Sequence, residues 1–250
     1  MQRNRRRTAW LAGITSLLLL GALGALLYGA GGWRTSAAQE SPSGVHLVLQ
    51  ADLHAVPAPE QPARLQDVVR IAEQRGRAAG AEDVWVRADG PDRVIVELAG
   101  TRDIGQAARL LTTSARLEFR EEVERPDGSH EWVAARGRTS SGQEVALTGQ
   151  YLSRATVGAE SRTNRPLVLF EFDPTGRQIL ATLTERIVGQ RLGIFLDDQL
   201  VVALTVRDPI TEGRGQISGS FTAASAQELA IALTSGALPV PLEVVEARAS

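Results

Sequence analysis

The chain of 250 residues contains no cysteine, which excludes disulfides, thiolate metal sites, a cysteine nucleophile and lipid attachment through cysteine. Lysine is also missing, so all 27 basic residues are arginines. Aromatic residues make up only 4% of the chain, and no cluster of arginines is interleaved with them. Beyond the first 33 residues, 23 arginines stand against 29 acidic residues, a net charge of −6. Because that charge does not attract phosphate backbones, nucleic-acid binding is not expected.

Charged residues are absent from one stretch of 25 positions, Ala9 to Trp33. A helix rises about 1.5 Å per residue and needs about 20 apolar residues to cross a bilayer core, so this stretch predicts a transmembrane helix at 9–33. The arginines before it predict that residues 1–8 form a basic cytoplasmic N-terminus. The chain after a small, polar linker at 34–44 should then be extracytoplasmic, in a single-pass protein of the cell membrane.

A cleaved signal peptide is the alternative to a retained anchor. Ser36, Ala37 and Ala38 have the small side chains that a cleavage site needs. The apolar core of a signal peptide runs about 7 to 15 residues, which is shorter than the stretch in this chain. The anchor is therefore the favoured interpretation.

Helical and strand patterns alternate after the linker and predict an α+β fold. The first lobe is predicted to follow a ferredoxin-like order, strand-helix-strand-strand-helix-strand, in these segments: strands 45–51, 84–87, 94–98 and 117–123, helices 64–79 and 103–111. The second lobe is predicted to contain these segments: strands 167–172, 192–196, 200–206 and 216–221, helices 176–188 and 223–235. Asp103, Asp173 and Thr222 are predicted to cap helices. A final strand at 242–245 is expected to return to the first sheet.

Two histidines and three glutamates are the first features that resemble a chemical site. His46 lies beside apolar neighbours in a strand, and His54 follows without a third ligand at regular spacing, so no metal site is predicted. Glu121, Glu122 and Glu124 are interpreted as the solvated end of a strand rather than as an acid–base pair.

Turn residues account for the remaining site-like features. Asp197 and Asp198 are interpreted as a tight turn. Gly213, Gly215 and Gly219 lack the spacing of a phosphate-binding loop and are interpreted as a hairpin that needs positive φ. No catalytic, cofactor-binding or metal-binding residue is predicted, and the chain is not expected to be an enzyme.

Several phrases of the sequence resemble the SecD subunit of the bacterial Sec protein translocase. In chain order they are VIVELAGT at 94–101, LEFR at 117–120, LTGQYL at 147–152, FEFDPTGRQIL at 170–180, VGQRLGIFLDDQLV at 188–201, DPITEGRGQISGSFT at 208–222 and LTSGALPVPLEVVEARAS at 233–250. The resemblance implies a ferredoxin-like base at 45–123 plus 242–250, with an inserted and mobile head at 124–241. It also implies SecF, the SecYEG channel, the membrane and unfolded exported polypeptides as partners, and no cofactor.

The sequence departs from the family at two places. Members usually carry a GLDLxGG motif after the first span, whereas this chain reads ESPSG at 40–44. Members also continue into further membrane spans that hold the proton-carrying aspartate, and this sequence ends at Ser250. No proton-relay residue can be transferred, so the resemblance predicts a binding domain rather than a proton-driven motor.

The predicted function is therefore that of an accessory component of Sec-dependent export, which binds translocating or emerging preprotein on the extracytoplasmic side. The residues that contact preprotein are unknown, but strands of the head and the helix at 223–235 are expected to frame a groove for it. The alternative is a stand-alone, membrane-anchored envelope module derived from SecD, with a binding or structural role and no part in translocation.

Overall fold

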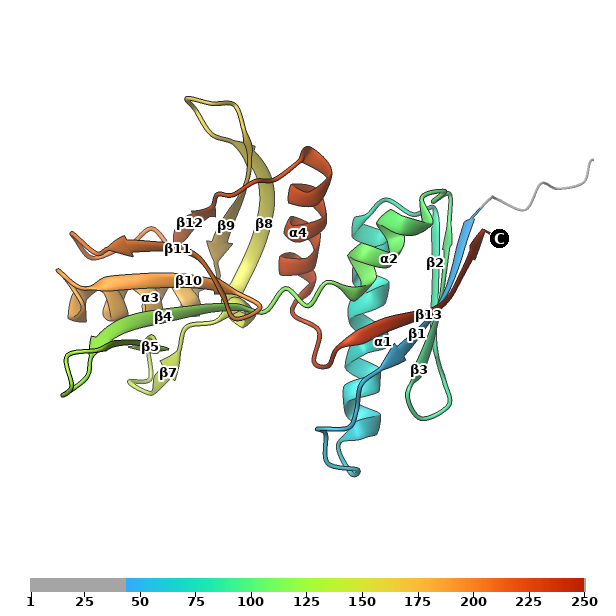
Figure 1. Ribbon diagram of the computed structural model, residues 1–250, viewed down its shortest axis with the longest axis horizontal. Helices are drawn as coiled ribbons and strands as arrows, with labels where there is room; N and C mark the ends of the chain where they lie inside the picture. Colours follow the sequence, from blue (N-terminus) through green and yellow to red (C-terminus); the bar gives the residue numbers. More distant parts are fainter. Residues whose placement is uncertain (1–43, 250) are drawn as a thin grey trace, which may run out of the picture. The chain divides into compact units, whose positions relative to one another are not determined.

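The computed structural model describes residues 44–249, which form two lobes (Figure 1). The predicted transmembrane helix at 9–33 lies outside the described residues. Among the residues that are described, no helix is both long enough and apolar enough to cross a membrane. The base lobe comprises β1 (Gly44–Ala51), α1 (Gln61–Ala78), β2 (Asp83–Asp89), β3 (Arg93–Ala99), α2 (Ile104–Thr112) and β13 (Leu242–Ala249).

The head lobe is inserted into the base lobe, between α2 and β13. Its elements are β4 (Leu117–Glu124), β5 (His130–Ala134), β6 (Arg136–Arg138), β7 (Glu144–Ala146), the 3-10 helix η1 (Gly149–Tyr151), β8 (Leu152–Ala159), β9 (Pro166–Phe172), α3 (Pro174–Arg186), β10 (Arg191–Leu196), β11 (Gln199–Thr205), β12 (Arg214–Ile217) and α4 (Ala223–Ser235). The sequence pattern predicts a hairpin tip at 125–128, and the pairing of β4 with β5 confirms it. The pattern did not predict strands β6, β7 and β8.

The base sheet has the strand order β13-β1-β3-β2, and all of its neighbours are antiparallel. Helices α1 and α2 cover one face of this sheet (Figure 1). Alternate residues of the central strand β1, Val45, Leu47 and Leu49, are fully buried in the core. The predicted return of the last strand is confirmed, because β13 pairs with β1 along its length.

The strand predicted at 117–123 does not belong to the base sheet. This strand, β4, pairs with β5 and β10, and its side chains Leu117 and Phe119 lie in the head core. The fourth strand of the base sheet is β13. Strand pairing therefore corrects the predicted boundary at 123, since the chain enters the head lobe between α2 and β4.

The head lobe contains a four-stranded sheet, β11-β10-β4-β5, a three-stranded sheet, β12-β9-β8, and the small β6-β7 pair. Phe119, Phe170 and Phe172 meet in its core, with ring centroids 5.5 to 6.0 Å apart. Helix α4 packs against β8 and β9. Its Thr234 hydroxyl accepts a hydrogen bond from the backbone N–H of Ala155, and so covers part of the β8 edge.

The three predicted helix caps are confirmed. Asp103 accepts a hydrogen bond from the N–H of Gln106, and Asp173 accepts one from the N–H of Gly176. Thr222 and Ser225 form a capping box at the start of α4.

Candidate functional site

The two histidines near β1 are not brought together. The His46 ring lies 3.4 Å from the Glu97 carboxylate, and its side chain is 11% exposed. His54 is exposed, and its backbone N–H donates to Asp52. Across residues 44–249, no three histidine or carboxylate side chains are placed to hold a metal ion.

The glutamates at 121 and 122 are ion-paired, which corrects the interpretation of a solvated strand end. Both carboxylate oxygens of Glu121 accept hydrogen bonds from Arg186, at 2.9 and 3.2 Å, and the Glu121 side chain is only 11% exposed. Glu122 pairs with Arg191 at 2.9 Å. The missed signal is the alternation of β4, because Leu117, Phe119 and Glu121 lie on one face of a strand.

Arg186→Met is expected to lower the free energy of unfolding by about 2 kcal/mol, because Glu121 would stay buried without its counter-charge. Glu121→Gln should cost less than about 1 kcal/mol, since Arg186 is half exposed and can be hydrated. Arg154→Met, which breaks a more exposed pair with Glu171, is the matched control. Chemical denaturation measures all three variants. Equal losses for Arg186→Met and the control would contradict this account of the pair.

The predicted turn at Asp197 and Asp198 is confirmed, because both residues have positive φ, 51° and 66°, between β10 and β11. The Asp197 carboxylate accepts a hydrogen bond from the backbone N–H of Arg116. Asp198 pairs with Arg120 and Arg116, and the hydrogen bond from Arg120 is the main cause that lowers the pKa of Asp198. The turn thus ties the β10-β11 hairpin to the start of β4.

The three glycines around β12 have different roles. They do not form the predicted hairpin, because β12 pairs with β9, which is distant in sequence. Only Gly213 has the predicted positive φ, +68°. A Cβ at Gly215 would lie 2.3 Å from the Phe170 ring, so this glycine is needed for close packing. Gly219 has neither constraint, since a Cβ there would meet its nearest neighbour at 3.3 Å.

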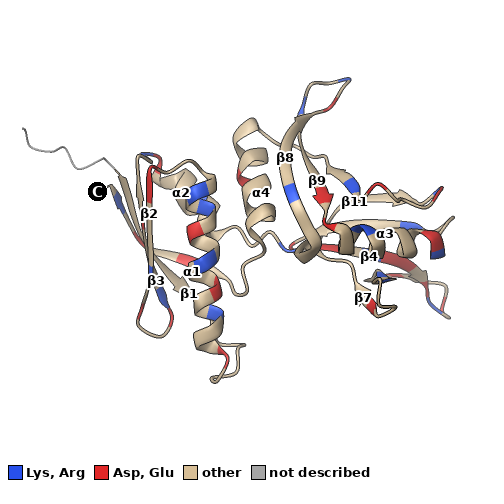
Figure 2. Ribbon diagram, turned by 180° about the vertical axis from the view of Figure 1, so that it is seen from behind, with Lys and Arg blue, Asp and Glu red and all other residues tan. Residues whose placement is uncertain are grey.

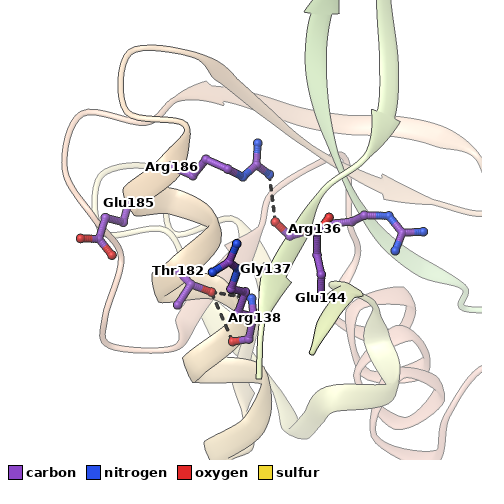
Figure 3. Close-up of a pocket in the computed structure, with 7 residues that line it drawn as sticks. All are labelled: Arg136, Gly137, Arg138, Glu144, Thr182, Glu185 and Arg186. Carbon is purple, nitrogen blue, oxygen red and sulfur yellow. Dashed lines mark hydrogen bonds between the residues drawn. The ribbon is translucent and has the colours of Figure 1, made fainter. Parts of the chain in front are cut away.

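A pocket of about 320 Å³ lies between the β6-β7 pair and α3 (Figure 3). Strand β6 approaches α3 closely at Gly137, and Thr182 on α3 accepts a hydrogen bond from the N–H of Arg138 at 2.7 Å. Arg186 donates to the carbonyl oxygen of Arg136. The lining mixes both charges: Arg136, Arg138 and Arg186 with Glu144 and Glu185. Such a rim offers polar contacts of both signs.

An apolar patch lies on the face of the four-stranded head sheet that points away from the core, beside charged side chains of β4. A Cβ at Gly193 would lie 2.8 Å from both the Phe195 and Trp132 rings and 3.1 Å from Leu200, so these three side chains close over the glycine. Phe195 is buried yet belongs to neither core, and Leu200 is 47% exposed. We call Trp132, Phe195 and Leu200 the outer patch.

Two arginines flank the outer patch. The guanidinium carbon of Arg120 lies 4.5 Å from the centroid of the Phe195 ring, and that of Arg191 lies 5.4 Å from the Trp132 ring. Leu200 belongs to β11, which ends the strand order of its sheet and pairs, among the described strands, only with β10. A strand edge beside an apolar face can accept an extended polypeptide.

The apolar side chains on the inner face of α4 lie in the head core: Ala226, Leu229, Ala230 and Leu233. The groove expected beside this helix stays a prediction. A pocket of about 400 Å³ lies at the end of the helix, where Leu233 and Ser235 contribute to its lining. Helix α4 carries a single charged residue, Glu228, whereas charges of both signs are interspersed along α1 and α3 (Figure 2).

Comparisons with known proteins agree with this architecture. The family described as "SecDF, P1 head subdomain" matches residues 130–240, and "Protein translocase subunit SecDF, P1 domain, N-terminal" matches residues 65–124. The chain belongs to the SecD family through its P1 domain. The N-terminal family match extends to residue 124 and so includes β4, which strand pairing groups with the head lobe.

Curated SecD proteins are similar over most of this chain. The protein translocase subunit SecD of Acidaminococcus fermentans is 35% identical over 205 residues, which cover 82% of this chain and 44% of the relative. The SecD of Acetobacter pasteurianus is 34% identical over 215 residues, which cover 82% of this chain and 41% of that relative. The chain thus spans less than half the length of these SecD proteins.

Solved SecDF structures are also similar. A crystal structure of SecDF in a super-membrane-facing form has a TM-score of 0.66 and 29% identity, with 94% of this chain and 35% of that one covered. A second structure, described as a membrane component SecDF that enhances protein export, has a TM-score of 0.63 and 29% identity. The match covers 82% of this chain and the whole length of that SecDF chain.

Proposed function

We propose that this P1 domain is an accessory component of Sec-dependent protein export that binds exported polypeptide on the extracytoplasmic side of the membrane. The support is the SecD family membership and the similarity to a SecDF structure described as enhancing protein export. The proposed role is binding rather than catalysis. The proposed topology is one N-terminal span at 9–33 with a cytoplasmic N-terminus. The proposed partners, which follow from the family membership, are SecF and the SecYEG channel.

The observation that carries the proposal is the outer patch beside the β11 edge. An unfolded chain offers unpaired backbone groups and scattered apolar side chains. The β11 edge can form hydrogen bonds with the unpaired backbone groups, and Leu200 and Trp132 can contact the apolar side chains. The aromatic and aliphatic contacts are not specific for one sequence, which suits a partner that varies from one exported protein to the next.

Site-specific photocrosslinking tests this role. A photoreactive amino acid at Leu200 is expected to capture a secretory chain stalled during export. The control is the same amino acid at Val188, which is 48% exposed in the head lobe but lies outside the outer patch. Capture at Val188 equal to that at Leu200, or no capture at either position, would contradict the proposed binding face.

The alternative role is a stand-alone envelope module without a part in translocation. Purification of the tagged full chain from membranes separates the two. Recovery of SecF or the SecYEG channel is expected for the export role, and their absence would favour the independent module.

A further inference from the structure

A fully buried arginine lies where the two lobes connect. Arg75, on α1, has no exposed surface and is the largest of the fully buried side chains. It follows Leu65, Val68 and Ala72 on the buried face of the helix. A charge in such a position requires several hydrogen-bond partners, because burial removes its hydration.

The partners of Arg75 are backbone carbonyls. Nη1 donates to the carbonyl oxygens of Leu110 and Thr113, at 2.9 and 2.6 Å, and Nη2 donates to that of Gly236 at 3.1 Å. Desolvation lowers the pKa of Arg75 to about 10, an effect that the charge of Asp197 partly offsets. The guanidinium thus remains charged at neutral pH.

These carbonyls belong to both connections between the lobes. Leu110 and Thr113 lie at the end of α2, where the chain leaves the base lobe for β4. Gly236 ends α4, where the chain returns toward β13. Carbonyls at helix C-termini lack intrahelical partners and carry partial negative charge, so one cation can satisfy both helix ends.

We propose that Arg75 is a latch that holds the outgoing and returning segments together and thereby sets the orientation of the head lobe relative to the base lobe. Two further bonds join the same region: the N–H of Leu238 donates to the carbonyl of Ser114, and Arg109 pairs with Glu228 across α2 and α4. Arg75 differs from both because it alone reaches both connections from a third element, α1. This role does not depend on what the head lobe binds.

The surroundings of Arg75 permit movement of the latch. Its Nε–H has no hydrogen-bond partner within residues 44–249, so the observed arrangement leaves one buried donor unsatisfied. A cavity of about 400 Å³ lies beside the connections, lined by Ile71, Ala115, Leu233 and Gly236 among others. The connecting segments therefore have adjacent space into which they can shift when the guanidinium releases them.

Hydrogen exchange of the full chain tests the latch. In Arg75→Met, amides of 110–116 and 235–241 are expected to exchange at least about tenfold faster, because both segments lose their shared donor. Amides of β1 and β3 should be unchanged. Arg77→Met is the matched control, since Arg77 lies on the same helix but is exposed. Equal acceleration in β1 and β3 would overturn the proposal, because it would indicate only a general packing role.

Measurement of the distance between the two lobes supplies the second test. Because the chain contains no cysteine, introduced cysteines can be labelled without removing native ones. Spin labels on cysteines introduced at the exposed positions Gln66 in α1 and Gln178 in α3 report the separation of the lobes. Arg75→Met is expected to broaden or shift the distance distribution, and Arg77→Met to leave it unchanged. If Arg75→Met fails to fold, Arg75→Lys keeps the charge but loses the forked donor, and should broaden the distribution in the same way. A folded Arg75 variant with the original distribution would refute the latch.

Discussion

Phe119→Ala is expected to destabilise the head lobe by about 3–5 kcal/mol, the usual cost of removing a buried phenylalanine. Phe119 is 3% exposed and contacts the rings of Phe170 and Phe172 in the head core. The loss should appear in denaturation of the full chain and, by hydrogen exchange, in β9 and β10. The base strands β1 and β3 should keep their protection, because Phe119 belongs to the head core and not to the base core.

Two variants control this result. Phe119→Leu retains most of the volume and should cost about 1.5 kcal/mol or less. Trp85→Ala removes a large side chain that is 60% exposed on β2, and should change stability by less than about 1 kcal/mol. Loss of protection in β1 and β3 alongside β9 would mean that β4 supports the base lobe, as the sequence order alone suggested.

The assignment of β4 illustrates where sequence patterns stop being informative. Alternation in LEFREEVE identifies a strand and its buried face, but it does not indicate which strand pairs with it. Four strands separated by helices in ferredoxin-like order were the simplest interpretation of residues 45–123. The true fourth strand, β13, is more than a hundred residues further along the chain. Its return to the first sheet was expected, but only the observed pairings show that it takes the place given to β4.

Local signals, in contrast, were reliable where one residue type has one dominant structural use. Asp173 followed by Pro174 marked the start of α3, and Asp197 with Asp198 marked a hairpin turn. The short strands β6 and β7 were missed because each has only three residues, which leaves little alternation to detect.

The polar residues that organise the structure were hidden for a related reason. Arg75 lies on the apolar face of α1 and Glu121 on the apolar face of β4, so each interrupts a pattern of apolar residues that otherwise predicts burial. A single charged residue on an apolar face indicates that it has a buried polar partner, but it does not identify that partner. Arg186 and the carbonyls of Leu110 and Gly236 are far from these residues in sequence, so their roles depend on the fold.

Gly137→Ala is expected to cost about 3 kcal/mol, at the upper end for added volume in a packed site. A Cβ at this position would lie 2.1 Å from the carbonyl oxygen of Ile179, a backbone atom of α3 that cannot move independently of its helix. Relief requires β6 to separate from α3, which would also break the hydrogen bond from the Arg138 N–H to Thr182. Denaturation should report the loss, and hydrogen exchange should locate it in β6.

Gly219→Ala is the matched control, because its new Cβ would meet only the Phe221 ring at 3.3 Å and its φ is not positive. That change should cost less than about 1 kcal/mol. Comparable losses at the two glycines would show that the close contact with the Ile179 carbonyl is not the cause. A large loss confined to Gly137→Ala would instead establish that the β6-α3 pocket depends on direct contact between two backbones, a requirement that no other residue type at position 137 can meet.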